Sequence, residues 1–365
     1  MCWMKGLRRM DRWLNKILLG NAPDVLMELP DKSIHCCVTS PPYWGLRDYG
    51  VEGQLGLEKT PEEYVQKMVD LFREVRRVLR DDGTLWLNLG DTYAAGGLGP
   101  GSGKQTTNYG SCNGSHIGKP RLAPMGLKPK DLVGIPWRVA FALQADGWYL
   151  RSDIIWHRPN QMPESVTDRP TKAHEYIFLM SKRERYYYDA DAIKEDCLSG
   201  PSDIKKMLES LPRIGGKHKI LTDPLSKASS LTNIGQKRAV GDPSGRNKRS
   251  VWTVATQPFK EAHFATFPPK LIEPCILAGC PAGGIVLDPF MGAGTTAVVC
   301  ANLGRNYIGI ELNPEYVHIA NERIKQATRQ ERLFIGDEKF FDPKRTPDAP
   351  KTGKVADRAD EKSIA

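Results

Sequence analysis

The sequence lacks the signatures of several protein classes, and each absence narrows what the chain can do. No apolar run approaches the roughly 18–20 residues that a membrane-spanning helix needs. The charged beginning of the chain is not followed by an apolar stretch of the secretory type, so we expect a cytoplasmic protein. None of the eight cysteines belongs to a Cys-x-x-Cys pair, which argues against a zinc site and against a disulfide framework.

The chain is long and mildly basic. Its 365 residues suffice for a full core and an enclosed site, in one large domain or two smaller ones. The formal net charge of +9 favours contact with polyanions such as nucleic acids, but many proteins of similar charge bind none. The charge therefore supports a nucleic-acid partner without establishing one.

Alternating helix and strand patterns run along most of the chain and predict an α/β fold. The clearest helix start is a capping box at Thr60 and Glu63, with Pro61 at the first helical position. Another proline, Pro136, is expected to break a helix over 131–145. Strands are expected over 36–38, 84–89, 148–156, 174–181, 284–288 and 306–311, and further helices over 295–303 and from 314 onward.

Two long segments lack this regular pattern. Residues 94–130 are rich in glycine, serine, asparagine and proline, and we expect them to form a flexible loop. Residues 195–250 contain 11 Lys or Arg against 6 Asp or Glu. We interpret this second segment as an inserted module, although a solvated basic surface would have the same composition.

A glycine-rich turn lies between a predicted strand and a predicted helix. Residues 288–297, DPFMGAGTTA, match the G-x-G-x-x-A form of the nucleotide-binding fingerprint, and Glu311 ends the next strand. Gly292 and Gly294 let a ligand approach the backbone at a helix N-terminus, and the Glu311 carboxylate can accept both hydroxyls of a ribose. The pattern predicts an adenosine-containing ligand.

Two other nucleotide sites fit this turn less well. No lysine follows the second glycine, and the spacing is too short for a Walker P-loop. No second nucleotide-binding half follows the turn, which disfavours a nicotinamide-dependent dehydrogenase.

The most specific string in the chain is TSPPYW at residues 39–44. It directly follows the apolar residues Cys36, Cys37 and Val38, which we assign to a buried strand and to the core. On its own, a Pro-Pro pair beside aromatic residues is typical of a rigid loop or a polyproline ligand. The presence of the glycine-rich turn in the same chain favours a functional site instead.

Together these two motifs resemble those of the DNA methyltransferases that modify amino groups. The catalytic motif of that family is S/D/N-P-P-Y/F/W, and its cofactor motif is similar to DPFMGAGTT at 288–296. The catalytic motif comes first in this chain, which is the order of the family's permuted β class. The resemblance extends from about Leu19 to about Arg323. It departs from the family at Asn21, where many relatives carry an acidic residue that contacts the cofactor.

The resemblance implies a doubly wound, Rossmann-like α/β fold with a mixed sheet of seven strands, one of them antiparallel. The catalytic part would span 17–194 and include the flexible loop 94–130. The cofactor-binding part of the same domain would span 251–330. Residues 195–250 between them would recognise the target sequence, and 331–365 would form a loose tail.

The resemblance also implies S-adenosylmethionine (SAM) as the cofactor and double-stranded DNA as the substrate, without a metal. A bacterial, archaeal or phage origin and a cognate restriction endonuclease are further expectations. The residues expected to bind the cofactor come from the glycine-rich turn, from the end of the following strand, and from the segment after His263: Asp288, Phe290, Gly292, Gly294, Thr295, Glu311, Phe267 and Pro268.

In the chemistry of this family, the residues that hold the base are Ser40, Pro41, Pro42 and Tyr43. An exocyclic amino nitrogen is conjugated with its ring and is a poor nucleophile, so positioning must carry the reaction. The Ser40 hydroxyl and the Pro41 carbonyl can accept the two amino hydrogens, and the prolines stiffen that frame. Tyr43 can stack on a base swung out of the duplex. Asp91 either faces this site or caps the next turn.

The expected target is N4 of cytosine, because the adenine enzymes usually carry Asp or Asn in place of Ser40. Adenine N6 is the alternative, since the same frame accepts either amino group. No Pro-Cys pair occurs at the catalytic motif, which argues against cytosine C5 methylation because that reaction needs a thiolate nucleophile. A catalytically silent DNA-binding protein is a further alternative, and the intact Ser40, Tyr43 and Glu311 argue against it.

Overall fold

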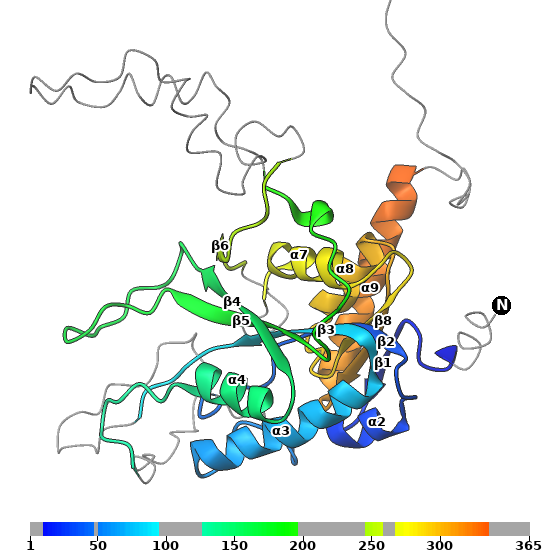
Figure 1. Cartoon of the computed structure of the whole chain (residues 1–365). Helices are drawn as coiled ribbons and strands as arrows, with labels where there is room; N and C mark the ends of the chain where they lie inside the picture. The colour runs from blue at the N-terminus through cyan, green and yellow to red at the C-terminus, as the bar shows by residue number, and fades with distance from the viewer. Residues whose placement is uncertain (1–9, 47–49, 95–125, 196–244, 258–266, 336–365) are drawn as a thin grey trace, which may run out of the picture.

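The computed structural model describes residues 10–46, 50–94, 126–195, 245–257 and 267–335 (Figure 1). These residues form one eight-stranded sheet with helices on both faces. The strands are β1 (Lys16–Leu19), β2 (Ile34–Thr39), β3 (Leu79–Leu89), β4 (Tyr149–His157), β5 (His174–Ser181), β6 (Val251–Thr253), β7 (Ile285–Asp288) and β8 (Asn306–Glu311). The helices are α2 (Ala22–Glu28), α3 (Pro61–Val78), α4 (Ile135–Ala145), α7 (Pro269–Gly279), α8 (Thr295–Asn302), α9 (Pro314–Ile335) and the short 3-10 helix η1 (Asp191–Ile193).

The strand order across the sheet is β1-β8-β7-β2-β3-β5-β4-β6. Neighbouring strands are parallel except where β5 pairs with β3 and with β4, so β5 is antiparallel to both its neighbours. The predicted doubly wound mixed sheet with one antiparallel strand is confirmed. The predicted number of seven strands is wrong for the described residues. The three-residue β6 adds an eighth strand at the edge, where Trp252 pairs with Trp156.

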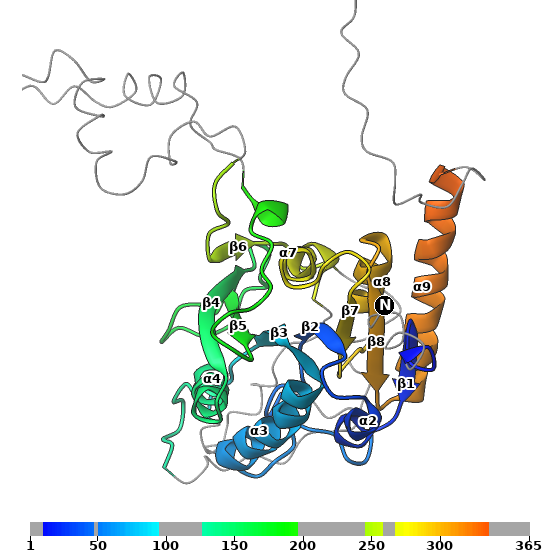
Figure 2. The same ribbon diagram turned by 45° about the vertical axis from the view of Figure 1, so that its right-hand side comes forward.

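Alternate residues of the strands face opposite sides of the sheet, and both sides are apolar. On one side Cys37 and Leu287 pack in the core formed with α2, α3 and α4. On the other side Cys36 and Val286 pack with α7 and α8, and α9 lies beside α8 (Figure 2). Both cysteines are fully buried, as predicted, and burial raises the pKa of each thiol. Because helices cover both faces, a ligand must approach at the strand ends.

Helix α3 begins where the sequence predicts. The Thr60 hydroxyl accepts a hydrogen bond from the Glu63 N–H at 3.1 Å, and Pro61 lies in the first turn. The Glu63 carboxylate accepts from the Lys59 N–H at 3.0 Å, so the capping box closes one residue earlier than its usual form. The apolar face of α3 is buried against the sheet.

Helix α4 begins at Ile135, later than predicted, and Pro136 does not break it. Pro136 lies in the first turn, where the missing N–H has no helical partner to lose. One carboxylate oxygen of Asp91 accepts hydrogen bonds from the N–H groups of Gly134 and Ile135 at 2.9 and 3.0 Å. Asp91 therefore caps α4, which decides between the two roles that the sequence leaves open.

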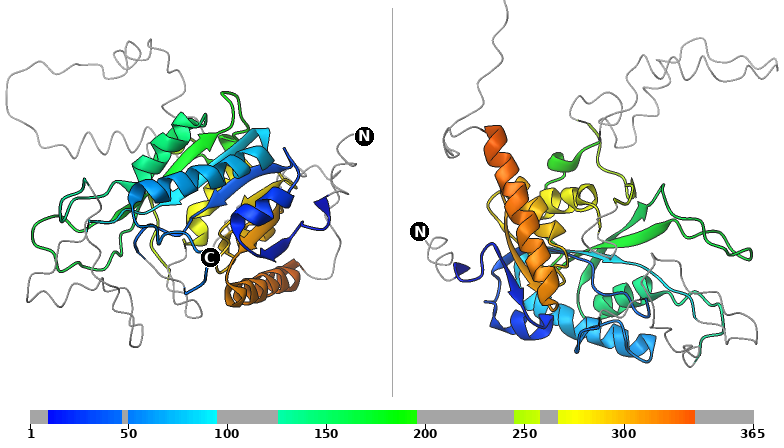
Figure 3. Two further views of the ribbon diagram at one scale, coloured as in Figure 1. Left: turned by 90° about the horizontal axis from the view of Figure 1, so that it is seen from below. Right: turned by 180° about the vertical axis from the view of Figure 1, so that it is seen from behind.

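The first strand and the last helix of the described chain lie side by side, because β1 packs against α9 (Figure 3). Helix α9 extends to Ile335, past residue 330 where the sequence suggests a tail. Residues 95–125, 196–244 and 336–365, in the predicted loop, insertion and tail, lie outside the described residues, as does His263. No helix within the described ranges is long and apolar enough to cross a membrane.

Candidate active site

Both sequence motifs lie at one edge of the sheet. The parallel strands β8, β7, β2, β3 and β4 end at this edge, and the antiparallel β5 begins there. Open α/β sheets bind their ligands outside the carboxyl ends of their strands. The residues that the edge carries, in strand order, are Glu311, Asp288, Ser40, Gly90, Glu175 and Arg158.

Asp288 connects the two motifs from the interior. Its carboxylate accepts hydrogen bonds from the hydroxyl of Thr39 at 2.7 Å and from the hydroxyl of Thr296 at 2.6 Å. It also accepts from the Phe290 N–H at 3.0 Å. The side chain is fully buried, and burial raises its pKa to about 6. Asp288 therefore positions the ends of β2 and β7 from within the core, and its side chain does not face the open edge.

The raised pKa predicts an unusual pH dependence of stability for Asp288. The folded chain keeps the proton up to about pH 6, whereas the unfolded chain releases it near the ordinary value of about 3.9. Stability contributed by protonated Asp288 is therefore lost as pH rises from about 4 to about 6. Relative to Asp288→Asn, the unfolding free energy of the natural chain is expected to fall by on the order of 2–3 kcal/mol over this window. Urea titrations at several pH values measure it, and parallel profiles would contradict this assignment.

Glu311 and Gly292 form the open part of the glycine-rich turn. The Glu311 carboxylate accepts from the N–H groups of Gly292 and Asn313, each at 2.8 Å. Burial of Glu311 raises its pKa, and beyond its backbone donors the carboxylate keeps acceptor capacity for a ligand. Gly292 has a φ of +53°, and among the described residues a Cβ added there would meet no atom nearer than 3.9 Å. A ligand can therefore approach this backbone closely while the carboxylate accepts its hydroxyls.

Gly294 and Thr295 are packed against α9. A Cβ on Gly294 would lie 2.8 Å from the Ala320 side chain, and the φ of +80° also favours glycine. Thr295 is nearly buried, and its hydroxyl accepts from the Arg323 guanidinium at 3.3 Å. Gly294 thus has a packing role that the sequence does not reveal, so its replacement would disturb the fold as well as any ligand.

The aromatic residues predicted beside the cofactor lie next to the two cores. Phe290 is partly buried and packs against the core beneath α2, α3 and α4. Phe267 is partly buried against the opposite core, and the buried Pro268 precedes α7 as its N-cap residue. Asn21, the departure from the family pattern, stands at the N-cap of α2 and donates to Asp24 at 3.3 Å.

The Pro-Pro segment is fixed by its neighbours. Pro41 is buried, and the Pro42 carbonyl accepts a hydrogen bond from the Tyr64 hydroxyl of α3 at 2.9 Å. The indole of Trp44 is buried and donates to the Glu58 carbonyl at 3.0 Å. Trp44 therefore fills core space, and the segment is held rigidly at the end of β2.

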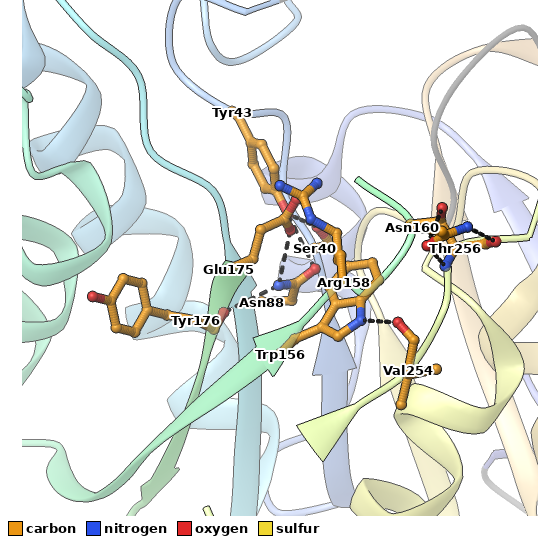
Figure 4. Close-up of polar contacts among 10 residues, drawn as sticks. All are labelled: Ser40, Tyr43, Asn88, Trp156, Arg158, Asn160, Glu175, Tyr176, Val254 and Thr256. Atoms are coloured by element: carbon orange, nitrogen blue, oxygen red, sulfur yellow. Dashed lines mark hydrogen bonds and ion pairs between the residues drawn. The ribbon is translucent and has the colours of Figure 1, made fainter. Parts of the chain in front are cut away.

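Tyr43 is anchored through its hydroxyl (Figure 4). The hydroxyl of Ser40 donates to the Tyr43 oxygen at 3.1 Å, while Glu175 and Asn88 oxygens lie 2.7 and 3.0 Å from it. The ring lies against Gly90, where an added Cβ would come within 2.5 Å of a ring carbon. Any side chain at position 90 would therefore displace the aromatic ring.

An ion pair lies behind Tyr43, and the sequence did not predict it. Glu175 and Arg158 join at 2.8 Å, and their side chains are 12% and 11% exposed. Asn88 donates to the Tyr176 carbonyl at 3.0 Å, which fixes its amide with the oxygen towards Tyr43. Glu175 reaches this edge because β5 runs antiparallel, and no local sequence signal specifies that direction.

Comparison with known proteins shows that the chain is similar to DNA methylases. A family model for DNA methylases of the N6 and N4 type matches residues 34–322. The type II methyltransferase M.Cfr9I of Citrobacter freundii is 47% identical over 310 residues, which cover 84% of this chain and 86% of the relative. The type II methyltransferase M.SmaI of Serratia marcescens is 47% identical over 309 residues, which cover 85% and 90%.

A solved structure has a similar fold. The PvuII DNA methyltransferase, described as cytosine-N4-specific, aligns over 89% of this chain and 96% of its own length. The TM-score is 0.53 and the sequence identity is 19%, so the likeness concerns the fold.

Proposed function

This chain belongs to the amino-methylating DNA methylase family, and we propose that it methylates N4 of cytosine at a specific sequence in duplex DNA. Enzymes of the family act on DNA and take the methyl group from SAM. The observation that carries the cytosine assignment is the hydroxyl of Ser40 at the first position of the catalytic motif. The type II relatives make a cognate restriction endonuclease a further proposed partner.

The described residues fit SAM. Glu311 would accept the ribose hydroxyls, and the open side of Gly292 would admit the ligand beside the backbone. Phe290 and Phe267 would enclose the cofactor from the two sides of the edge. When bound, SAM supplies a methyl group activated by its positive sulfonium.

Ser40 and Pro41 would hold the target amino group. Because the Ser40 O–H donates to Tyr43, the lone pairs of its oxygen remain available to accept an amino hydrogen. The Pro41 carbonyl would accept the second hydrogen, which turns the nitrogen lone pair towards the methyl donor. An enzyme that acts on a base needs it outside the stack, so the base is proposed to flip out of the duplex.

The cytosine assignment rests on the length of the first motif residue. The hydroxyl of Ser40 sits one bond nearer the backbone than the acceptor oxygens of Asp or Asn. Mass spectrometry of nucleosides from DNA treated with the protein and SAM is expected to reveal N4-methylcytosine. DNA treated with Ser40→Ala is the control. N6-methyladenine as the sole new product would overturn the assignment and leave the family membership intact.

Target recognition is proposed for the segment within residues 195–250. At its base, Glu195 and Arg246 exchange backbone hydrogen bonds at 2.9 and 2.8 Å. The Glu195 carboxylate also pairs with Arg249 at 3.0 Å. The chain therefore leaves and rejoins the described structure at one place. Lysines and arginines of the segment would position phosphates and read guanine edges.

This closed base allows an exchange experiment. Replacing residues 196–244 with the corresponding segment of a relative is expected to change the methylated sequence, because the joints at Glu195 and Arg246 stay paired. SAM affinity should stay within about twofold, since the cofactor edge is untouched. Sequencing of the methylated positions measures the outcome. A chimera that keeps the original target would instead move recognition to the loop 94–130.

A further inference from the structure

The proposed reaction leaves a proton that the site must remove. When the lone pair of the amino nitrogen forms a bond to the methyl carbon, the carbon–sulfur bond of the donor would break with its electron pair on sulfur, and the nitrogen becomes positively charged. It returns to neutrality only by losing one of its hydrogens as a proton. In the described structure Ser40 is the side chain at the motif's first position, and its hydroxyl donates to the Tyr43 oxygen (Figure 4).

The hydrogen bonds beyond Ser40 have a single consistent direction. Ser40 donates to the Tyr43 oxygen, so the Tyr43 proton must point to another acceptor. Glu175 lies at 2.7 Å and is charged, whereas the Asn88 amide oxygen lies at 3.0 Å and is neutral. The shorter, charge-assisted bond is therefore the stronger, and the chain of donors runs from Ser40 through Tyr43 to Glu175.

We propose that this chain is a proton relay, with Glu175 as the final acceptor and Arg158 paired with the other carboxylate oxygen of Glu175. The N–H bond of the methylated amino group breaks, and its electron pair stays on nitrogen. The proton passes to Ser40 Oγ, the Ser40 proton to the Tyr43 oxygen, and the Tyr43 proton to Glu175 Oε2. The products are a neutral methylamino group and a neutral carboxylic acid. Glu175 acts through Tyr43 and Ser40, so it is a positioning residue.

The chemistry requires only a weak base at the end of the relay. The exocyclic amino nitrogen of a nucleobase is a very weak base because its lone pair is conjugated with the ring. A carboxylate is therefore basic enough to take the proton from the methylated, positively charged nitrogen. Burial, reinforced by the neighbouring Glu175 charge, raises the pKa of Tyr43 well above its usual value. Tyr43 therefore gives its proton to Glu175 at the same time as it receives one from Ser40, and it does not become an anion.

The other buried carboxylates at this edge are engaged elsewhere. Asp288 accepts from Thr39 and from two further donors in the core. Asp91 caps α4 and lies 3.6 Å from the Lys172 ammonium. Within the described part of the chain, the charged or titratable groups around Glu175 are Arg158, Lys172, His174 and Tyr43 itself.

The test is a double-mutant cycle on the single-turnover rate at saturating SAM and DNA. Glu175→Gln and Tyr43→Phe are each expected to slow methyl transfer about 100-fold or more. Because both interrupt one relay, the double variant should be no more than about threefold slower than the slower single variant. Losses that multiply would overturn the relay, as would a Tyr43→Phe rate within threefold of the natural chain. Tyr43→Phe retains the Glu175–Arg158 pair, so it decides the question even if Glu175→Gln does not fold.

A pH profile separates proton transfer from simple packing. The relay needs an acceptor that is free to take a proton, so the natural rate is expected to fall towards acid, and the residual rate of Glu175→Gln should lack that fall. The same fall in both proteins would overturn the relay. Glu74→Gln, which breaks a 2.8 Å pair with Arg77 on α3, is the matched control and should leave the rate unchanged. The relay rests on the proposed function, which fails separately if the natural chain methylates no amino group.

Discussion

Ser40→Ala is expected to slow the single-turnover methylation rate about 10²–10³-fold, equivalent to about 3–4 kcal/mol of transition-state stabilisation. The variant lacks the oxygen that we propose accepts an amino hydrogen, and it also removes the first member of the hydrogen-bonded chain to Tyr43. SAM affinity should remain within about twofold. Glu311 and Gly292 are positioned by β8 and β7, and neither contact depends on the serine hydroxyl.

Ser33→Ala provides the matched control for this prediction. The Ser33 hydroxyl also makes a local hydrogen bond, to the Pro30 carbonyl at 2.7 Å, but it precedes β2 at the opposite edge of the sheet. Its loss should leave the methylation rate unchanged. Wild-type transfer by Ser40→Ala under single-turnover conditions would remove Ser40 from the catalytic frame.

Glu311→Gln is expected to weaken SAM binding about 100-fold. A charged carboxylate that accepts two ribose hydroxyls contributes about 1.5–3 kcal/mol per hydrogen bond, and loss of about 3 kcal/mol corresponds to that change. An amide has only one acceptor oxygen, so it cannot serve both hydroxyls and the N–H groups of Gly292 and Asn313. Isothermal titration calorimetry without DNA measures the dissociation constant.

A matched control for the cofactor site lies on α9. Glu322→Gln loses an exposed pair with Lys325 at 2.7 Å and should bind SAM normally. Gly292→Leu adds a second test, because its side chain would enter the space where no described atom lies within 3.9 Å of an added Cβ. Unchanged affinity in both Glu311→Gln and Gly292→Leu would place the cofactor elsewhere. Gly294 is a poorer choice, since its replacement would first collide with Ala320.

The elements around the motifs could be predicted closely from the sequence. The strands over 174–181 and 306–311 have the predicted bounds, because continuous apolar runs between polar residues mark buried strands. Thr60 marks the start of α3 through a short-range capping pattern. Ser40 and Glu311 could be placed at one edge because the ends of parallel strands meet there.

The remaining features depend on contacts between distant segments. Glu175 becomes part of the site only through the antiparallel direction of β5, and Arg158 only through the pairing of β4 with it. Gly294 must be a glycine because Ala320 on α9 leaves no room for a side chain. Gly90 must be a glycine because the Tyr43 ring leaves none. The sequence does not reveal that Pro136 starts α4, because a proline that starts a helix and one that breaks it differ only in where the helix begins.

The pairing of β1 with β8 sets when the protein can become active during its synthesis. Lys16 lies opposite Ile308, and Leu19 lies opposite Glu311, so strands from the two ends of the described chain share one ladder. A chain emerging from the ribosome exposes Ser40 long before Gly292 and Glu311. Contacts this distant in sequence also form slowly. A nascent or truncated chain that lacks β7 and β8 therefore has the motif around Ser40 but not the proposed cofactor site, and we expect methylation only after β8 has joined β1.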